Sequence, residues 1–144
     1  MTVERIIGLD VGEVRIGVAV SDPLGSMALP RDVIKRGGTE PTMAAVKELI
    51  DDTGASRIVV GLPLNQHGEP GPQAEKVRRF AGELEQRFGL PVDTQDERFS
   101  TAEAERTLIG ADVSRKNRRK VVDKMAAQHI LQTYLDRRAR GDNA

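Results

Sequence analysis

Residues 8–22, GLDVGEVRIGVAVSD, decide how this chain folds. Two β-type runs, residues 6–11 and 16–21, flank a short connection containing Gly12, which predicts an antiparallel hairpin with a tight turn. Asp10 stands inside the first run among apolar neighbours, where a carboxylate must lose its water. That loss is costly unless a cation or hydrogen-bond donors compensate it. The hairpin therefore raises the question of what compensates Asp10.

Apolar periodicity in the rest of the chain predicts strands that alternate with helices. Residues 57–62, RIVVGL, form a continuous apolar run, which is typical of a strand buried on both faces. The other expected elements are a strand at residues 31–35, helices from Pro41 to Gly54 and from Pro72 to Gly89, a strand at residues 91–97, a short helix after a capping box of Ser100 and Glu103, a basic loop at residues 110–120 and a long helix at residues 121–140. This order implies an α/β fold, a mixed five-stranded sheet with helices on both faces.

Composition restricts the class of protein. With 144 residues, 38% apolar and 31% charged, we expect one folded domain over residues 1–144. The absence of cysteine excludes disulfides, thiolate metal sites and cysteine nucleophiles, and it fits a cytoplasmic location. No run reaches transmembrane length and the first apolar stretch is too short for a signal peptide, so we expect no membrane partner. One tyrosine, three phenylalanines and no tryptophan argue against a platform that stacks single-stranded bases.

The net charge of zero conceals an uneven distribution. Residues 1–114 hold 13 basic against 19 acidic residues, whereas residues 115–144 hold 9 basic against 3 acidic ones. Such an asymmetry suggests a polyanionic partner for the C-terminal segment. A solvated helix face that balances an acidic body explains the same numbers, and charge alone does not separate the two interpretations.

Further acidic positions are expected at the sheet edge where Asp10 lies. Functional groups of α/β sheets collect at the carboxyl ends of the parallel strands. Asp96 and Glu97 end the last strand and alternate in direction, so at most one of them joins a site there. Taken singly, each acid is better explained as a structural or solvated carboxylate. In the last helix, Asp123 shares one stripe with Ala126, Ala127, Ile130 and Tyr134.

Three acids on three elements, all directed toward one sheet edge, favour a chemical role. Their mutual repulsion raises the pKa of each carboxyl unless a cation neutralises them. Oxygen ligands without histidine or cysteine suit Mg²⁺ or Mn²⁺. Two such ions about 4 Å apart activate a water and stabilise the leaving oxygen in phosphodiester hydrolysis. The sequence thus predicts a divalent-metal-dependent nuclease in which Asp10 is buried to hold metal.

Four motifs resemble one protein family. The segments GLDVGEVRIGVAVSD, VVGLPLNQHGEPG, DERFST and VVDKMAAQHILQTYL occur in this order over nearly the whole chain, and together they are similar to the YqgF (RuvX) family. The resemblance implies a ribonuclease-H-like fold. It implies either a nuclease that processes the 5′ end of precursor 16S ribosomal RNA (pre-16S rRNA) or a Holliday junction resolvase. It also implies that the catalytic and metal-binding acids are Asp10, Glu97 and Asp123.

The turn after Asp10 departs from the pattern of that family. Glu13 and Val14 stand where Thr or Arg and then Lys are usual, which leaves Arg15 as the basic residue of the turn. Arg15 is therefore expected beside the scissile phosphate. Neither histidine is assigned to the site, because His67 is expected in an exposed loop and His129 in the core.

Further nucleic-acid contacts are expected on both sides of the capping box. Arg98 and Thr101 follow Glu97, where they either orient the metal site or a phosphate or cap the next helix. Residues 114–120, SRKNRRK, directly precede the helix of Asp123, so a strand bound there would be led toward the metal site. The basic residues of this segment are Arg115, Lys116, Arg118, Arg119 and Lys120.

Several alternatives stay open at this point. An ATP-binding protein of the actin and sugar-kinase type shares the strand–Asp–Gly start, although such enzymes clamp nucleotide between two domains. A non-enzymatic nucleic-acid-binding module for ribosome assembly would use only the basic segment and bind ribosomal particles. Within the nuclease hypothesis, pre-16S rRNA and branched DNA require the same chemistry. A resolvase that cuts two strands symmetrically is expected to be a homodimer, whereas an RNA-processing nuclease can be a monomer.

Overall fold

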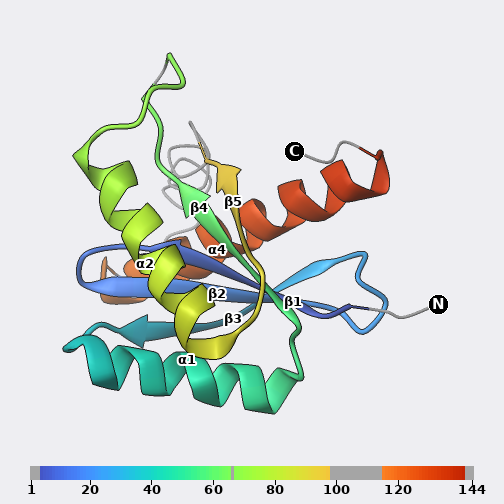
Figure 1. Cartoon of the computed structure of the whole chain (residues 1–144), viewed down its shortest axis with the longest axis horizontal. Coiled ribbons are helices and arrows are strands. Elements are labelled where there is room, and N and C mark those ends of the chain that lie inside the picture. The colour runs from blue at the N-terminus through green and yellow to red at the C-terminus, as the bar shows by residue number, and fades with distance from the viewer. Residues whose placement is uncertain (1–3, 66, 98–114, 142–144) are drawn as a thin grey trace.

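The structure is a computed structural model that describes residues 4–65, 67–97 and 115–141, with the backbone alone for residues 115–120. Its elements follow the expected order (Figure 1). They are β1 (Ile6–Val11), β2 (Arg15–Ser21), β3 (Ala28–Lys35), α1 (Thr39–Thr53), β4 (Arg57–Leu62), α2 (Pro72–Phe88), β5 (Val92–Asp96) and α4 (Arg115–Ala139).

The five strands form one mixed sheet in the order β3-β2-β1-β4-β5. The β1–β2 and β2–β3 pairs are antiparallel, whereas β1 pairs with β4 and β4 with β5 in parallel. The predicted hairpin is confirmed, with Asp10 opposite Gly17. The carboxyl ends of β1, β4 and β5 consequently meet at one edge of the sheet, which is where functional groups collect in such folds.

Helices cover both faces of the sheet, as predicted. Side chains of a strand alternate between the faces. The larger core lies under α1 and α2 and includes Leu9 of β1 and Val60 of β4. The smaller core lies under α4 and includes Ile6 and Val59. In Figure 1, α1 and α2 lie on one side of the strands and α4 crosses the other side.

Three glycines bring α4 close to the sheet; we call Gly8, Gly17 and Gly61 the glycine seat. They lie on β1, β2 and β4. A Cβ atom on Gly17 would stand 2.0 Å from the carbonyl oxygen of Asp123, and one on Gly8 would stand 2.7 Å from the Cβ of Leu131. At Gly61 it would stand 2.4 Å from the Cδ1 of Ile130. Gly17 and Gly8 therefore fix how closely α4 approaches, because a side chain there would meet the helix backbone or the Cβ of Leu131. At Gly61 an added Cβ would meet the ends of the Ile130 and Glu97 side chains.

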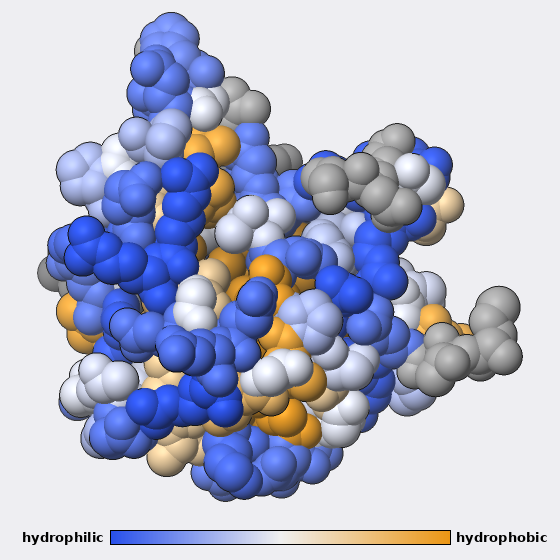
Figure 2. All heavy atoms as spheres, in the orientation of Figure 1, coloured by the Kyte–Doolittle hydropathy of each residue, from blue (hydrophilic) through white to orange (hydrophobic). Residues whose placement is uncertain are grey.

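The surface shown in Figure 2 is largely hydrophilic, with hydrophobic residues visible in the gaps between hydrophilic ones. The large apolar side chains that are exposed within the described residues are Val14, Leu24, Met27 and Leu29. In the same part of the chain, no helix has both the length and the apolar character needed to cross a membrane.

Three sequence predictions need correction. The third strand begins at Ala28, because Pro30 is accommodated on this edge strand, where it faces Ala19. The expected basic loop is wrong for residues 115–120, which form the first turns of α4. Lys and Arg are good helix formers, and a turn without apolar residues leaves no periodic signal. His129 is exposed and not in the core. The helix expected after Ser100 lies outside the described residues.

Candidate active site

Asp10 lies near the end of β1, on the face that α4 covers. Its neighbours on the strand, Leu9 and Val11, point into the opposite core. Burial raises the pKa of the Asp10 carboxyl to about 6, a hydrogen bond from Glu97 opposes that rise, and the charge of Asp123 adds to it. The structure therefore places a partly buried carboxylate near the end of β1, as the sequence predicts.

Glu97 directly follows β5 and extends its pairing with β4, since its backbone N–H donates to the carbonyl of Leu62 over 3.2 Å. Strand alternation turns Glu97, and not Asp96, toward α4. The glycine seat makes room for it: a Cβ on Gly61 would stand 2.6 Å from Glu97 Oε2. Burial is the largest of the causes that raise the pKa of Glu97 to about 8. The negative charge of Asp10 and the hydrogen bond that Glu97 donates to Asp10 raise it further.

Asp123 reaches the same edge from α4. Its backbone oxygen lies over Gly17, the residue opposite Asp10 in the hairpin. Its carboxylate Oδ2 accepts a hydrogen bond from Arg15 Nε at 2.6 Å. The Arg15 and Asp123 side chains are 34% and 19% exposed, so this ion pair is partly screened from water. The predicted stripe is confirmed, because Ala126, Ala127 and Ile130 are buried.

The three acids thus approach one another, but their side chains are not arranged as a set of metal ligands. Asp10 and Glu97 share a hydrogen bond, whereas Asp123 is engaged by Arg15. Within residues 4–65, 67–97 and 121–141, no three His, Cys, Asp or Glu side chains are grouped closely enough to hold a metal ion. Their chemistry nevertheless fits a hard divalent cation, because all three side chains are carboxylates. Two of them, Asp10 and Glu97, are partly buried, and a bound cation would relieve the repulsion between their charges.

Of the residues predicted to contact nucleic acid, the structure describes the side chain of Arg15 and not those of the others. Arg15 lies at the site, bonded to Asp123. Arg98 and Thr101 lie outside the described residues. The basic segment forms the start of α4, directly before the turn that carries Asp123. The structure describes only the backbone of residues 115–120. The residues concerned are Arg115, Lys116, Arg118, Arg119 and Lys120.

The glycine seat is the functional feature that sequence reasoning missed. An isolated glycine within a β-type run signals close backbone approach or a bulge. Gly8, Gly17 and Gly61 all give that signal in the sequence. The structure adds that the three lie on neighbouring strands under the same helix.

Comparison with known families gives a match over residues 4–137 to the family described as "RuvX: Holliday junction resolvase". The chain belongs to the RuvX family. The match extends from before β1 to within the last turn of α4, so it includes Asp10, Glu97 and Asp123.

Curated sequence relatives of this RuvX-family chain carry the name "Putative pre-16S rRNA nuclease". One from Moorella thermoacetica is 53% identical over 133 residues, which cover 92% of this chain and 95% of the relative. One from Symbiobacterium thermophilum is 54% identical over 135 residues, covering 94% of each. One from Streptococcus pneumoniae serotype 19F is 50% identical over 137 residues, which cover 93% of this chain and 99% of the relative. Relatives named as nucleases favour the nuclease prediction over the kinase alternative.

Solved structures confirm the ribonuclease-H-like fold. Thermus thermophilus RuvC, in complex with a Holliday junction substrate, matches with a TM-score of 0.58 and 18% identity over 96% of this chain and 97% of that one. The fowlpox virus Holliday junction resolvase matches with a TM-score of 0.56 and 13% identity, over 92% of this chain and 97% of the resolvase chain. At such low identity the likeness concerns the fold.

Proposed function

We propose that this chain is a divalent-metal-dependent nuclease that processes pre-16S rRNA. The observation that carries the proposal is the approach of Asp10, Glu97 and Asp123 from three different elements to one sheet edge. Burial raises the pKa of two of these carboxyls, which makes them costly to maintain without a cation. The names of the curated relatives support the choice of RNA as substrate.

We assign the metal to Asp10, Glu97 and Asp123, and the ion to Mg²⁺ or Mn²⁺. When bound, such an ion activates a water and stabilises the leaving oxygen of a phosphodiester. Asp10 and Glu97 contribute as a pair, since both must be deprotonated to act as ligands. With its pKa raised to about 8, Glu97 holds a proton at neutral pH and must lose it before the site is complete.

Arg15 has a second role in this proposal. Its guanidinium binds Oδ2 of Asp123, so coordination of a metal through that oxygen requires the ion pair to open. The released guanidinium stays at the first residue of β2, beside the site, where it can bind a phosphate oxygen. Arg15 would therefore exchange a carboxylate partner for a phosphate partner as substrate and metal enter.

A resolvase acting on branched DNA is the second candidate. The family description and the two resolvase structures favour it. The same three carboxylates would perform the hydrolysis, so the site does not separate the substrates. A resolvase would act as a homodimer on paired strands. Ribosomal particles as partners belong only to the first candidate.

Incubation of the purified chain with pre-16S rRNA and, separately, with a four-way DNA junction tests both candidates. We expect Mg²⁺- or Mn²⁺-dependent cleavage of the RNA, lost in Asp10→Asn, Glu97→Gln and Asp123→Asn. Mg²⁺ should also raise the melting temperature of the wild type, because only the folded site organises the ligands, and Asp10→Asn should weaken that rise. Cleavage of the junction alone would favour the resolvase. Near-normal cleavage by Asp123→Asn would refute the assignment of the three acids.

A further inference from the structure

Gln95 of β5 is a polar residue in a buried position. Its side chain is on the face of the sheet that α4 covers, because Gln95 pairs with Gly61, whose Cβ position meets Ile130 of α4. Only 4% of the residue is exposed. An apolar side chain would suit such a position, whereas a buried amide is costly unless both of its ends form hydrogen bonds.

The two ends of the Gln95 amide join α4 to the backbone of β5. Oε1 accepts a hydrogen bond from Nη1 of Arg137 at 2.8 Å. Nε2 donates to the carbonyl oxygen of Asp96 at 3.2 Å. A guanidinium only donates and a carbonyl only accepts, so the bridging residue must offer one acceptor and one donor. Glutamine offers both, whereas leucine offers neither and an ionised glutamate cannot donate.

The Asp96 carbonyl belongs to the peptide group that carries Glu97. The N–H of that group, on Glu97, donates to the carbonyl of Leu62 at the end of β4. A trans peptide directs its N–H and its C=O in opposite directions, so the Asp96 carbonyl points away from β4. Leu62 and Gln95 therefore hold the two ends of one peptide group, and Arg137 holds Gln95.

Glu97 has less support from the sheet than Asp10 has. Asp10 lies in β1, between β2 and β4, whereas Glu97 follows the last residue of β5, which is an edge strand. The end of an edge strand opens more readily than the middle of a sheet, because a neighbouring strand pairs with one side of it alone. The connection from Arg137 through Gln95 adds support from α4, the helix that also carries Asp123.

We propose that Gln95 is a positioning residue for Glu97 and that Arg137 acts through Gln95. The consequence for metal binding rests on the function proposed above, in which Glu97 is a ligand. Groups that hold a ligand in place typically change metal affinity by about tenfold or more. Tyr134 provides a comparison, since it joins α4 to Asp93, two residues before Gln95 on the same face. That bond does not reach the peptide group of Glu97.

Amide hydrogen exchange of the full ¹⁵N-labelled chain in EDTA tests the positioning role without metal. Gln95→Met keeps most of the buried volume and removes both hydrogen bonds. We expect the Glu97 amide to exchange about fivefold faster or more, while the amide of Leu9 in β1 keeps its rate. Tyr134→Phe is the matched control and should leave exchange at Glu97 unchanged. Equal acceleration at Glu97 in both variants, or none in Gln95→Met, would overturn the proposal.

Calorimetric titration with Mg²⁺ measures whether the position of Glu97 matters to the carboxylate site. Gln95→Met should weaken Mg²⁺ binding by about tenfold, and Tyr134→Phe should not. Arg137→Met should weaken it too, but not further in a chain that already carries Gln95→Met. Unchanged affinity in Gln95→Met would overturn the positioning role, and additive losses would overturn the link through Arg137. A wild type that binds no Mg²⁺ would refute the proposed function, while the exchange rates would still decide whether Gln95 holds Glu97.

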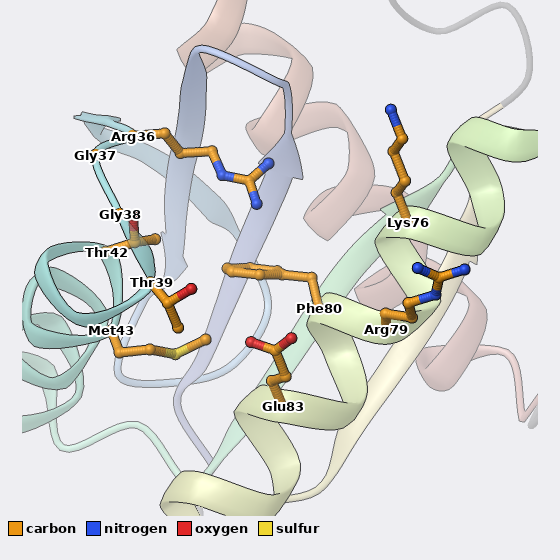
Figure 3. Close-up of a pocket in the computed structure, with 10 residues that line it drawn as sticks. All are labelled: Arg36, Gly37, Gly38, Thr39, Thr42, Met43, Lys76, Arg79, Phe80 and Glu83. Atoms are coloured by element: carbon orange, nitrogen blue, oxygen red, sulfur yellow. The ribbon is translucent and has the colours of Figure 1, made fainter.

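Arg137→Met also removes a positive charge, which a second control accounts for. Arg79 lines a cavity of about 370 Å³ between α1 and α2, and none of the described residues that line this cavity belongs to β5 or α4 (Figure 3). Arg79→Met removes the same charge on the opposite face of the sheet. Loss of a cation should by itself leave Mg²⁺ binding unchanged or slightly tighter. Weaker binding in Arg137→Met alone supports its role, and equal weakening in both variants would overturn it.

Discussion

Gly17→Ala should damage the carboxylate site without touching an acid. The added Cβ would stand 2.0 Å from the carbonyl oxygen of Asp123, whereas ordinary contact begins near 3.4 Å, so α4 must retreat by about 1.4 Å. Overpacking of this kind costs about 1–3 kcal/mol, and we expect the upper end because backbone meets backbone. A displacement of about 1 Å at a reacting group can lower the rate about a hundredfold.

The assay combines thermal unfolding in EDTA, the rise in melting temperature with Mg²⁺, and cleavage. Gly17→Ala should lower all three readouts. The control is Gly82→Ala in α2, where a Cβ meets nothing within 4 Å. It should stabilise the chain by about 0.5–1 kcal/mol, because alanine is the better helix former. A Gly17→Ala variant with wild-type stability and wild-type cleavage would refute the role of the glycine seat.

Three further predictions follow from charge. Because the pKa values of Asp10 and Glu97 are raised, the folded chain binds more protons than the unfolded chain. The contribution of these two groups to the free energy of unfolding in EDTA should therefore be largest below about pH 4 and be lost as pH rises through about 6 for Asp10 and about 8 for Glu97. Urea titrations should show a flatter pH profile in Glu97→Gln. Arg15→Gln should free Asp123 and strengthen Mg²⁺ binding in calorimetry while weakening cleavage; weaker Mg²⁺ binding would contradict the role of Arg15. Replacing Arg115, Lys116, Arg118 and Arg119 with Ala should reduce the slope of log affinity against log salt for all nucleic-acid sequences, and an unchanged slope would mean that the strand approaches by another face.

The order of strands and helices was predictable because apolar periodicity records which face of an element is buried. The partial burial of Asp10 was predictable for a related reason, since this residue stands among apolar neighbours inside a strand. The choice of Glu97 over Asp96 needed the direction of β5, which alternation alone left open. The position of Asp123 over Gly17 joins residues more than 100 positions apart, and no local pattern records that contact.

The errors have equally local causes. The first turns of α4 lack apolar residues, so periodicity placed the start of this helix near residue 121 and not at Arg115. His129 precedes the buried Ile130 by one position, which is about 100° around the helix and turns it to solvent. The pairing of Arg15 with Asp123 joins residues 108 positions apart, and no local sequence pattern indicates it.

The packing of α4 onto the glycine seat also determines when, during synthesis of the chain, the carboxylate site can form. Asp10 and its hairpin leave the ribosome long before Asp123, yet one of the three acids belongs to α4, as does the cover of the smaller core within the described residues. Until that helix docks, the nascent chain exposes Ile6, Val59 and the rest of the smaller core. An unfinished chain therefore cannot assemble the three acids, so the hydrolytic activity proposed for this site would begin only after α4 has emerged and docked.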